Sequence, residues 1–206
     1  MSFNSIPTVR GYNTGEVVSA LQKAIRRSDD EAALFWAVEL DRSGYGQYCW
    51  RRLLIMVSED IGLANPELPQ QVFALHGIYK ELLAWKNRNH PERLQLVHAV
   101  LLMARSPKSR MLDHACHVAY TTNETIAMPD YALCMHTGQG RMMGRGLDHW
   151  YSDAANLVGG LDLDDKWEVK SRDLAYNPPS SKPSERKLGK NDFSDPEEEQ
   201  ESVLPF

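Results

Sequence analysis

Residues 28–44 read SDDEAALFWAVELDRSG, and this stretch predicts a helix with a marked start and a marked end. Ser28 can accept a hydrogen bond from the third backbone N–H of the helix while Glu31 reaches back to the Ser28 N–H, which is the pattern of a capping box. An apolar run follows from Ala32 to Leu40, and Gly44 supplies a residue at which helices commonly stop. The stretch is therefore expected to be a helix packed into a core.

Helical spacing continues on both sides of this stretch. Apolar residues recur at helical spacing after Thr14, and again from Gly46 to Ile61, where Gly62 is expected to end the helix. Three X-Pro pairs then favour helix starts. Pro has no backbone N–H, and at the first helical position this N–H would have no partner within the helix. These pairs are Asn65-Pro66, His90-Pro91 and Ser106-Pro107, and the predicted helices span residues 14–27, 32–40, 46–61, 66–86, 91–105 and 107–120. Alternating strand patterns are missing, so the sequence predicts an all-α helical bundle.

The helical period weakens after residue 120. Residues 148–158 are expected to form one short helix and residues 166–175 an extended segment. Residues 177–190 are rich in Pro, Ser and Lys, which is typical of a flexible linker. The predicted organisation is an N-terminal arm (1–13), a helical oligomerisation domain (14–120), an irregular Gly/His/Arg-containing extension (121–176), and a disordered linker with an acidic tail (177–206).

Composition limits the class of protein. The 206 residues are 42% hydrophobic, enough for one core, and the formal net charge of -5 arises from the acidic end of the chain. Cys49, Cys116 and Cys134 are odd in number and lack CxxC spacing, which favours reduced thiols. Because no apolar run approaches the ~20 residues that span a bilayer, and no signal-peptide pattern is present, we expect a cytoplasmic protein without a membrane partner.

The last fifteen residues combine an acidic run with an apolar end. Residues 192–201 contain six acids and no Lys or Arg, and Ser202-Val203-Leu204-Pro205-Phe206 follows. This tail resembles the tip of bacterial single-stranded-DNA-binding proteins, which ends in Asp-Ile-Pro-Phe and enters basic-rimmed pockets of replication and repair enzymes, although Val203-Leu204 stands here for Asp-Ile. An ordinary solubilising tail is the alternative. The predicted partner-binding residues are Val203, Leu204, Pro205, Phe206, Glu197, Glu198 and Glu199.

Four stretches carry a second resemblance. They are SALQKAIRRSD (19–29), AALFW (32–36), RRLLIMVSEDIGLA (51–64) and ARSPKS (104–109). In this order and spacing they resemble the C-terminal region of the replication-associated recombination AAA+ ATPases, the family that includes the bacterial MgsA/RarA proteins and the Werner-helicase-interacting protein. The resemblance covers residues 14–120, and the chain is expected to leave the family's usual ending after Tyr120. It implies an all-α, clamp-loader-like collar that oligomerises as a dimer or tetramer, with itself or with a full-length ATPase of the family.

A phosphate loop is missing from the sequence. The Gly-rich residues 137–146 lack the Lys-Ser/Thr pair of GxxxxGK(S/T), whose Lys and backbone N–H groups hold the phosphates of a nucleotide. We therefore expect no ATP hydrolysis, no catalytic residues and no cofactor.

Two groups of basic residues are candidates for phosphate contact. Residues of the first group lie at predicted helix ends, where they either contact phosphate or form a salt-bridged helix junction with Glu59 and Asp60. In the second, Arg141 and Arg145 with His136 are expected to contact an anion or single-stranded DNA, and Trp150 to stack on a base, against the alternative of a structural loop. The first group is Arg26, Arg27, Arg51, Arg52, Arg105, Lys108 and Arg110.

Metal-type ligands occur between residues 113 and 149. His114 and His117 share a helix face at i, i+3, but CxxC and HExxH spacings are missing, so no metal site is expected. The set is Asp113, His114, Cys116, His117, Cys134, His136 and His149. The leading hypothesis is a non-enzymatic helical adaptor in DNA replication, recombination or repair. A metal-dependent hydrolase or nuclease that uses this set is the alternative, and a DNA-binding accessory protein is a third hypothesis.

Overall fold

The structure, a computed structural model, describes residues 6–161 and 163–179. Within these residues the regular elements are helices, and one isolated antiparallel bridge joins Pro7 to Asn13. The predicted all-α class is confirmed. The chain divides into two compact units, Met1–Glu124 and Thr125–Phe206, and each unit is described by itself.

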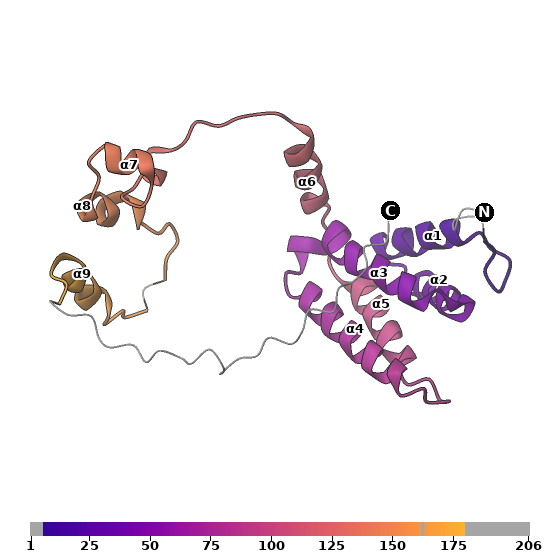
Figure 1. The fold of residues 1–206 in the computed structure, drawn as a ribbon. Coiled ribbons are helices and arrows are strands. Elements are labelled where there is room, and N and C mark those ends of the chain that lie inside the picture. Colours follow the sequence, from indigo (N-terminus) through magenta and orange to yellow (C-terminus); the bar gives the residue numbers. More distant parts are fainter. Residues whose placement is uncertain (1–5, 162, 180–206) are drawn as a thin grey trace, which may run out of the picture. The chain divides into compact units, whose positions relative to one another are not determined.

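In its described residues, the first unit is a bundle of five α-helices followed by a sixth. In Figure 1, α1, α2, α3, α4 and α5 pack together, and α6 stands apart from them. The closest pairs in the bundle are α1 with α2, α4 with α5, and α2 with α5. The helices are α1 (Thr14–Arg26), α2 (Asp30–Leu40), α3 (Gly46–Met56), α4 (Leu68–Ala84), α5 (Arg93–Arg105) and α6 (Met111–Thr121), with the short helices η2 (Asp41–Tyr45), η3 (Val57–Ile61) and η4 (Gly62–Ala64) between them.

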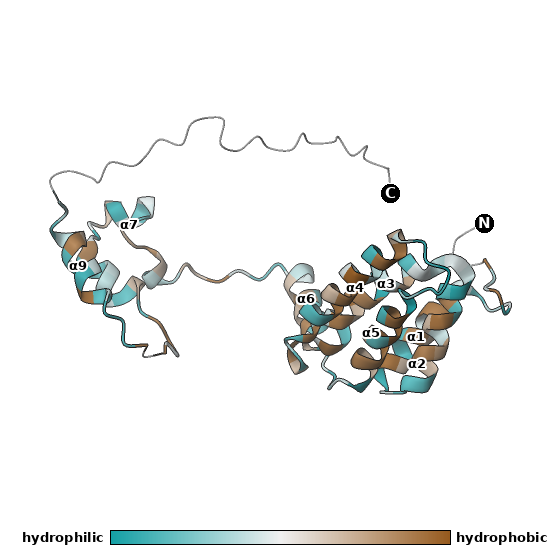
Figure 2. Cartoon of the chain, turned by 90° about the horizontal axis from the view of Figure 1, so that it is seen from below, coloured by the Kyte–Doolittle hydropathy of each residue, from teal (hydrophilic) through white to brown (hydrophobic). Residues whose placement is uncertain are grey.

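Apolar side chains from α1 to α5 form one continuous core. Leu21, Trp50 and Leu53 have no exposed surface, and the apolar stretches of the five helices are visible in Figure 2. Burying one such side chain contributes about 1.5–3 kcal/mol, so the core is the main source of stability for this unit. Trp85, which directly follows α4, is 62% exposed and lies outside this core.

The start of α2 differs from the capping box predicted at Ser28. Ser28 has φ +56°, a left-handed conformation that is not that of a cap residue. Asp29 caps the helix instead, because its Oδ1 accepts a hydrogen bond from the Ala32 N–H at 3.0 Å. The chain turns sharply at Ser28 because α1 and α2 are antiparallel neighbours that only Arg27, Ser28 and Asp29 connect.

The X-Pro pairs place the later helix starts too early. α4 begins at Leu68, with Pro69 in its first turn, and the Asn65 side chain donates to the Ser106 hydroxyl at 2.9 Å. α5 begins at Arg93 and α6 at Met111, two and four residues after the starts predicted from Pro91 and Pro107. Gly62, with φ +48° at the end of η3, is the predicted stop of the third helix.

An N-terminal arm lies against the bundle before α1. Glu39 of α2 is fully buried, and its carboxylate accepts hydrogen bonds from the backbone N–H of Arg10 at 3.0 Å and from the Arg10 guanidinium. Burial alone would raise the Glu39 pKa, but hydrogen bonds from Thr8 and Arg10 outweigh it and lower the pKa. This pair therefore holds the arm against the C-terminal end of α2.

The second unit contains short helices. They are η5 (Asp130–Ala132), α7 (Gly138–Met142), α8 (Leu147–His149), η6 (Trp150–Ala154) and α9 (Glu168–Tyr176). The helix predicted after Asp148 is present in shorter form as α8 and η6. The extended segment predicted at 166–175 is wrong, because residues 168–176 form α9. Among the described residues of this unit, Cys134 is the buried apolar residue.

Candidate interaction surfaces

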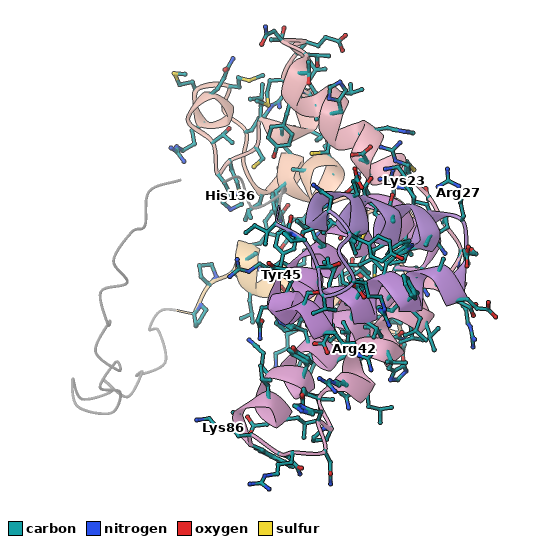
Figure 3. The ribbon with its side chains drawn as sticks, turned by 90° about the vertical axis from the view of Figure 1, so that its right-hand side faces the viewer. Lys23, Arg27, Arg42, Tyr45, Lys86 and His136 are labelled. Atoms are coloured by element: carbon teal, nitrogen blue, oxygen red, sulfur yellow. The ribbon has the colours of Figure 1, made fainter. Side chains whose placement is uncertain are left out.

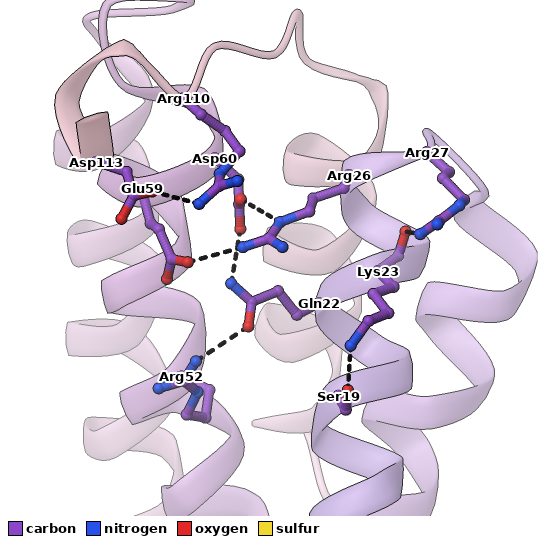
Figure 4. Close-up of polar contacts among 10 residues, drawn as sticks. All are labelled: Ser19, Gln22, Lys23, Arg26, Arg27, Arg52, Glu59, Asp60, Arg110 and Asp113. Carbon is purple, nitrogen blue, oxygen red and sulfur yellow. Dashed lines mark hydrogen bonds and ion pairs between the residues drawn. The ribbon is translucent and has the colours of Figure 1, made fainter.

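Asp60 is the centre of a buried polar network that joins α1 to η3. It is 1% exposed, and it accepts hydrogen bonds from the Arg26 Nε–H and from the Gln22 side-chain amide at 3.0 Å. Arg26 also pairs with Glu59 at 2.7 Å, and Arg52 donates to Gln22 at 3.1 Å, as Figure 4 shows. A buried carboxylate costs several kcal/mol unless it is paired in this way. Arg26 and Arg52 therefore stabilise the contact of α1 with α3 and η3.

Three more residues of this basic group also have partners in the first unit, and Arg51 is exposed on α3. Lys108 donates to the Ala104 carbonyl at 2.8 Å and to the Ser106 carbonyl, which satisfies the C-terminal end of α5. Arg105 pairs with Asp30 at 2.8 Å and Arg110 with Asp113. Of the two interpretations of this basic group, the contacts favour the salt-bridged junction.

Lys23 and Arg27 lie on the exposed side of α1. Figure 3 shows both side chains directed away from the bundle. Arg27 donates to the Lys23 carbonyl at 3.1 Å, close to the C-terminal end of the helix. A cation at that end interacts favourably with the helix dipole, so these side chains have a local structural role.

Arg145 organises the second unit. Its guanidinium donates to the Asp130 carbonyl at 2.7 Å and to the Leu133 carbonyl at 2.8 Å, and it pairs with the Asp130 carboxylate. The hydrogen bond and charge of Arg145 lower the Asp130 pKa. Arg141 donates to the His136 carbonyl at 3.2 Å. Both arginines that were predicted to bind phosphate therefore donate hydrogen bonds to backbone carbonyls of their own unit.

His136 and Trp150 lie next to each other. Their rings meet edge to face with centroids 4.7 Å apart, and His136 is labelled in Figure 3. Gly140 allows the chain to fold closely here, because a Cβ at this position would overlap the carbonyl group of Cys134. Gly140 is therefore needed for the close approach of its backbone to the Cys134 carbonyl. The four predicted residues His136, Arg141, Arg145 and Trp150 form one cluster, held by internal contacts.

The predicted metal-type ligands are divided between the two units. Asp113, His114, Cys116 and His117 lie on α6, where Asp113 pairs with Arg110. In the second unit the Cys134 sulfur lies 3.5 Å from His136 Nδ1, and His149 Nε2 is 3.9 Å from Asp130. In residues 6–161 and 163–179, no three His, Cys, Asp or Glu side chains converge as a metal site requires. The same residues include no helix with the length and apolarity needed to cross a membrane.

The surface that sequence reasoning missed is the face of α6. None of its residues is buried, and Met111 and Val118 are 61% and 56% exposed. Two hollows flank the helix: the first is lined by α6 residues from Met111 to Ala119, and the second by Leu112, Cys116 and Ile55 of α3. Apolar residues at i, i+4 and i+7 were the available signal, but spacing cannot tell whether a partner covers them.

The predicted tail contacts lie outside the described residues. Val203, Leu204, Pro205, Phe206, Glu197, Glu198 and Glu199 all belong to residues 180–206. Their proposed role rests on the sequence.

These helices and their salt-bridged junction define an all-α bundle domain. The chain belongs to the family described as MgsA AAA+ ATPase C terminal, which matches residues 27–191. This match confirms the resemblance found in residues 14–120. It also corrects the expectation that the chain leaves the family after Tyr120, because the matched region includes most of the second unit.

Several proteins are similar to this chain over part of their length. Replication-associated recombination protein A of Bacillus subtilis is 32% identical over 140 residues, which cover 66% of this chain and 32% of that protein. The protein of the same name from Escherichia coli K12 is 27% identical over 187 residues, or 87% and 40%. ATPase WRNIP1 of Dictyostelium discoideum is 30% identical over 145 residues, or 68% and 16%. The chain thus spans less than half of each of these relatives.

Proposed function

We propose that this chain is a helical assembly module that acts in DNA replication or recombination and does not hydrolyse nucleotides. Its bundle associates with further copies or with a full-length ATPase of the family. The observation that carries this proposal is the match of residues 27–191 to the C-terminal region of these ATPases. The process is taken from the name of the relatives called replication-associated recombination protein A.

The residues present support a role without nucleotide chemistry. The chain contains no GxxxxGK(S/T) sequence, and Gly138 and Gly140 of its Gly-rich stretch belong to the five-residue helix α7. A phosphate loop needs backbone N–H groups directed at the phosphates and a Lys to neutralise them. Here the Gly140 N–H donates to the Thr137 hydroxyl at 3.0 Å, and Lys is missing from residues 137–146.

Residues 192–206 add a docking peptide to the proposal. Six acids and the apolar Val203, Leu204, Pro205 and Phe206 have the chemistry of an extended peptide that enters an apolar pocket with a basic rim. The proposed partner is a protein that recognises single-stranded-DNA-binding protein tips. Removing Phe206 from the peptide is expected to weaken binding about thirtyfold, since a buried aromatic anchor contributes on the order of 2 kcal/mol.

Glu197, Glu198 and Glu199 are expected to act differently from Phe206. Exposed charges mainly increase the rate at which the peptide and its partner meet, so replacing these residues by Gln should reduce the association rate. The reduction should become smaller at high salt, because salt screens the charges. Binding of synthetic peptides 192–206 to such a partner measures both effects. If the peptide without Phe206 binds equally well, the docking role is contradicted and the segment only increases solubility.

Direct contact with single-stranded DNA is a weaker component of the proposal. His136 and Trp150 are in contact, and the exposed Arg141 of α7 donates to the carbonyl of the exposed His136. The internal hydrogen bonds of Arg145 argue for a structural role of that residue. Because the metal-type ligands do not converge in the described residues, no observation favours the hydrolase or nuclease alternative.

Co-elution with a full-length relative tests the proposal. The purified chain is mixed with the Bacillus subtilis protein, and an AAA+ ATPase from another family serves as the control. We expect the chain to co-elute with the Bacillus subtilis protein and not with the control ATPase. We also expect the chain by itself to release no phosphate from ATP. Saturable ATP hydrolysis that persists through further purification, or a chain that associates with neither itself nor the relative, would contradict the proposal.

A further inference from the structure

A small hollow lies between the C-terminal end of α2 and the start of α5. Its volume is about 190 Å³, and its lining combines three apolar side chains with two arginines and one carboxylate. An apolar cavity of about 150 Å³ is enough to hold a benzene ring, so the hollow has room for one large apolar side chain. The lining residues are Val38, Asp41, Arg42, Arg93, Leu96 and Val97.

Arg42 is a cation without a counter-ion at this hollow. Its side chain is exposed and has no hydrogen bond or ion pair with the described residues, and Figure 3 labels it. Arg93 differs, because its Nε–H pairs with the Asp41 carboxylate at 3.2 Å. The hollow therefore combines apolar walls with one arginine that is available to an anionic group.

The loop between α4 and α5 adds positive charge next to the hollow. Arg93 lines the hollow and is the first residue of α5, so the loop that precedes it begins at the edge of the hollow. Lys86 and Arg88 of this loop are exposed, and their side chains also have no partner among the described residues. The three unpaired cations Arg42, Lys86 and Arg88 are called the basic rim below.

Residues 192–206 of the same chain have the complementary chemistry. Residues 192–201 contain six acids and no Lys or Arg, and the apolar Val203, Leu204, Pro205 and Phe206 follow after one serine. A peptide of this kind suits an apolar hollow with a positive rim. At about 3.3 Å per residue, residues 180–206 can span up to roughly 90 Å. The 17-residue helix α4 is only about 26 Å long, so chain length does not limit the contact.

We propose that residues 203–206 occupy the hollow between α2 and α5 of their own molecule, with the acids of residues 192–201 along the basic rim. Phe206 is assigned to the hollow itself, because its ring is the largest apolar group of this segment. The inference rests on the docking peptide of the proposed function and gives that peptide a site on the bundle. A partner that binds the peptide must then displace it from the bundle, so the contact inhibits partner binding.

A weak contact is sufficient within one molecule. A tethered segment meets its own site at an effective concentration on the order of 1 mM, so a contact with a Kd of about 100 μM is already mostly occupied. One apolar side chain and a few exposed charges are expected to give an affinity of this order. A second copy at micromolar concentration would leave so weak a site empty, which favours the chain's own segment as the occupant.

Competition between a free peptide and the chain's own segment tests the contact. A labelled peptide of residues 192–206 is titrated with the full chain carrying Phe206→Ala and with the unaltered full chain, and binding is followed by fluorescence anisotropy. We expect the Phe206→Ala chain to bind the peptide and the unaltered chain to bind it about fivefold more weakly or less, because its hollow is occupied. Equal binding by both chains, or binding by neither, would overturn the proposal.

A matched pair of variants tests the position of the site. Arg42→Glu and Arg51→Glu reverse the charge of two exposed arginines that have no side-chain partner among the described residues, and Arg51 does not line the hollow. Both are made in the Phe206→Ala chain, with circular dichroism as the check on folding. Arg42→Glu is expected to weaken peptide binding about fivefold or more, and Arg51→Glu to leave it within about twofold. Equal losses would indicate a general attraction between acids and the bundle and would overturn the site.

Binding of the same peptide to a protein that recognises single-stranded-DNA-binding protein tips separates this inference from the proposed function. A peptide that binds such a protein but not the Phe206→Ala chain would overturn the site on the bundle and leave the docking role intact. The reverse result would support the site on the bundle and contradict the partner named in the proposed function.

Discussion

The two units of this chain are stabilised in different ways. In the first, more than twenty buried apolar residues form one cluster across α1 to α5. In the described residues of the second, Cys134 alone is buried among the apolar residues, and Arg145 holds the loop through two backbone carbonyls and Asp130. Because apolar burial is the dominant favourable term in folding, the first unit is expected to unfold cooperatively and the second to open at low cost.

Replacing one Leu by Ala in each unit should give the largest difference in the free energy of unfolding. Leu53→Ala removes a fully buried side chain of α3 and leaves a cavity, so it is expected to lower the free energy of unfolding by about 3 kcal/mol, within the 2–5 kcal/mol usual for such changes. Leu174→Ala, at a residue of α9 that is 46% exposed, should change it by less than about 0.5 kcal/mol. Urea unfolding followed by circular dichroism measures both, and equal effects would show that the units share one core.

Removing the buried Asp60 carboxylate should cost somewhat less. Asp60→Ala deprives Arg26 and Gln22 of their acceptor, and Arg26 retains Glu59 and partial access to water. We expect a loss of about 2 kcal/mol, below the 3–5 kcal/mol of a completely buried pair. Glu59→Ala, which removes the more exposed partner, should cost less than about 1 kcal/mol. The reverse order would show that Asp60 is not the centre of the junction.

Acid should weaken the contact between the N-terminal arm and the bundle. The Glu39 pKa is lowered in the folded protein, so the stability that Glu39 contributes is complete above the pKa of the unfolded chain and is lost as the pH falls through the folded value. Glu39→Gln should remove this part of the pH dependence below about pH 4.5, where an unperturbed Glu titrates. Unfolding midpoints between pH 3 and 7 measure the difference, and parallel curves for the two proteins would contradict it.

A pair of glycines gives the smallest and most local effect. Gly140→Ala forces a Cβ into the Cys134 carbonyl group, whereas Gly138→Ala, two residues earlier, meets no atom within 4 Å. The first change should speed amide hydrogen exchange in residues 130–150 and leave the bundle unchanged, and the second should change neither. Faster exchange at α1 to α5 combined with no effect on residues 130–150 would contradict the separation of the units.

The sequence was most informative where local and tertiary signals agreed. α1 and α3 follow an apolar period, α2 contains a continuous apolar run, and Gly62 ends the third helix where a positive φ is needed. The cap of α2 was misplaced by one residue, because Ser28 turns through positive φ to bring α2 against α1. Helix α9 was missed because Trp167 and Val169 favour strands, while its Glu, Lys, Arg and Leu residues favour a helix.

The candidate surfaces were less predictable than the helices. Basic residues that suggested phosphate contact, such as Arg26 and Arg145, are paired with buried or backbone groups that lie far away in the sequence. Pairing of this kind depends on tertiary packing, which residue spacing does not encode. The exposed apolar face of α6 was not identified for the same reason, because exposure is a property of the folded unit.

Sedimentation equilibrium of the unaltered full chain, over roughly 1 to 100 μM to bracket moderate interface affinities, tests the assembly proposal most directly. The expected result is a mass that rises with concentration from that of the 23.4 kDa chain to that of a dimer or tetramer. A constant mass of 23.4 kDa across this range would contradict self-assembly through the helical bundle.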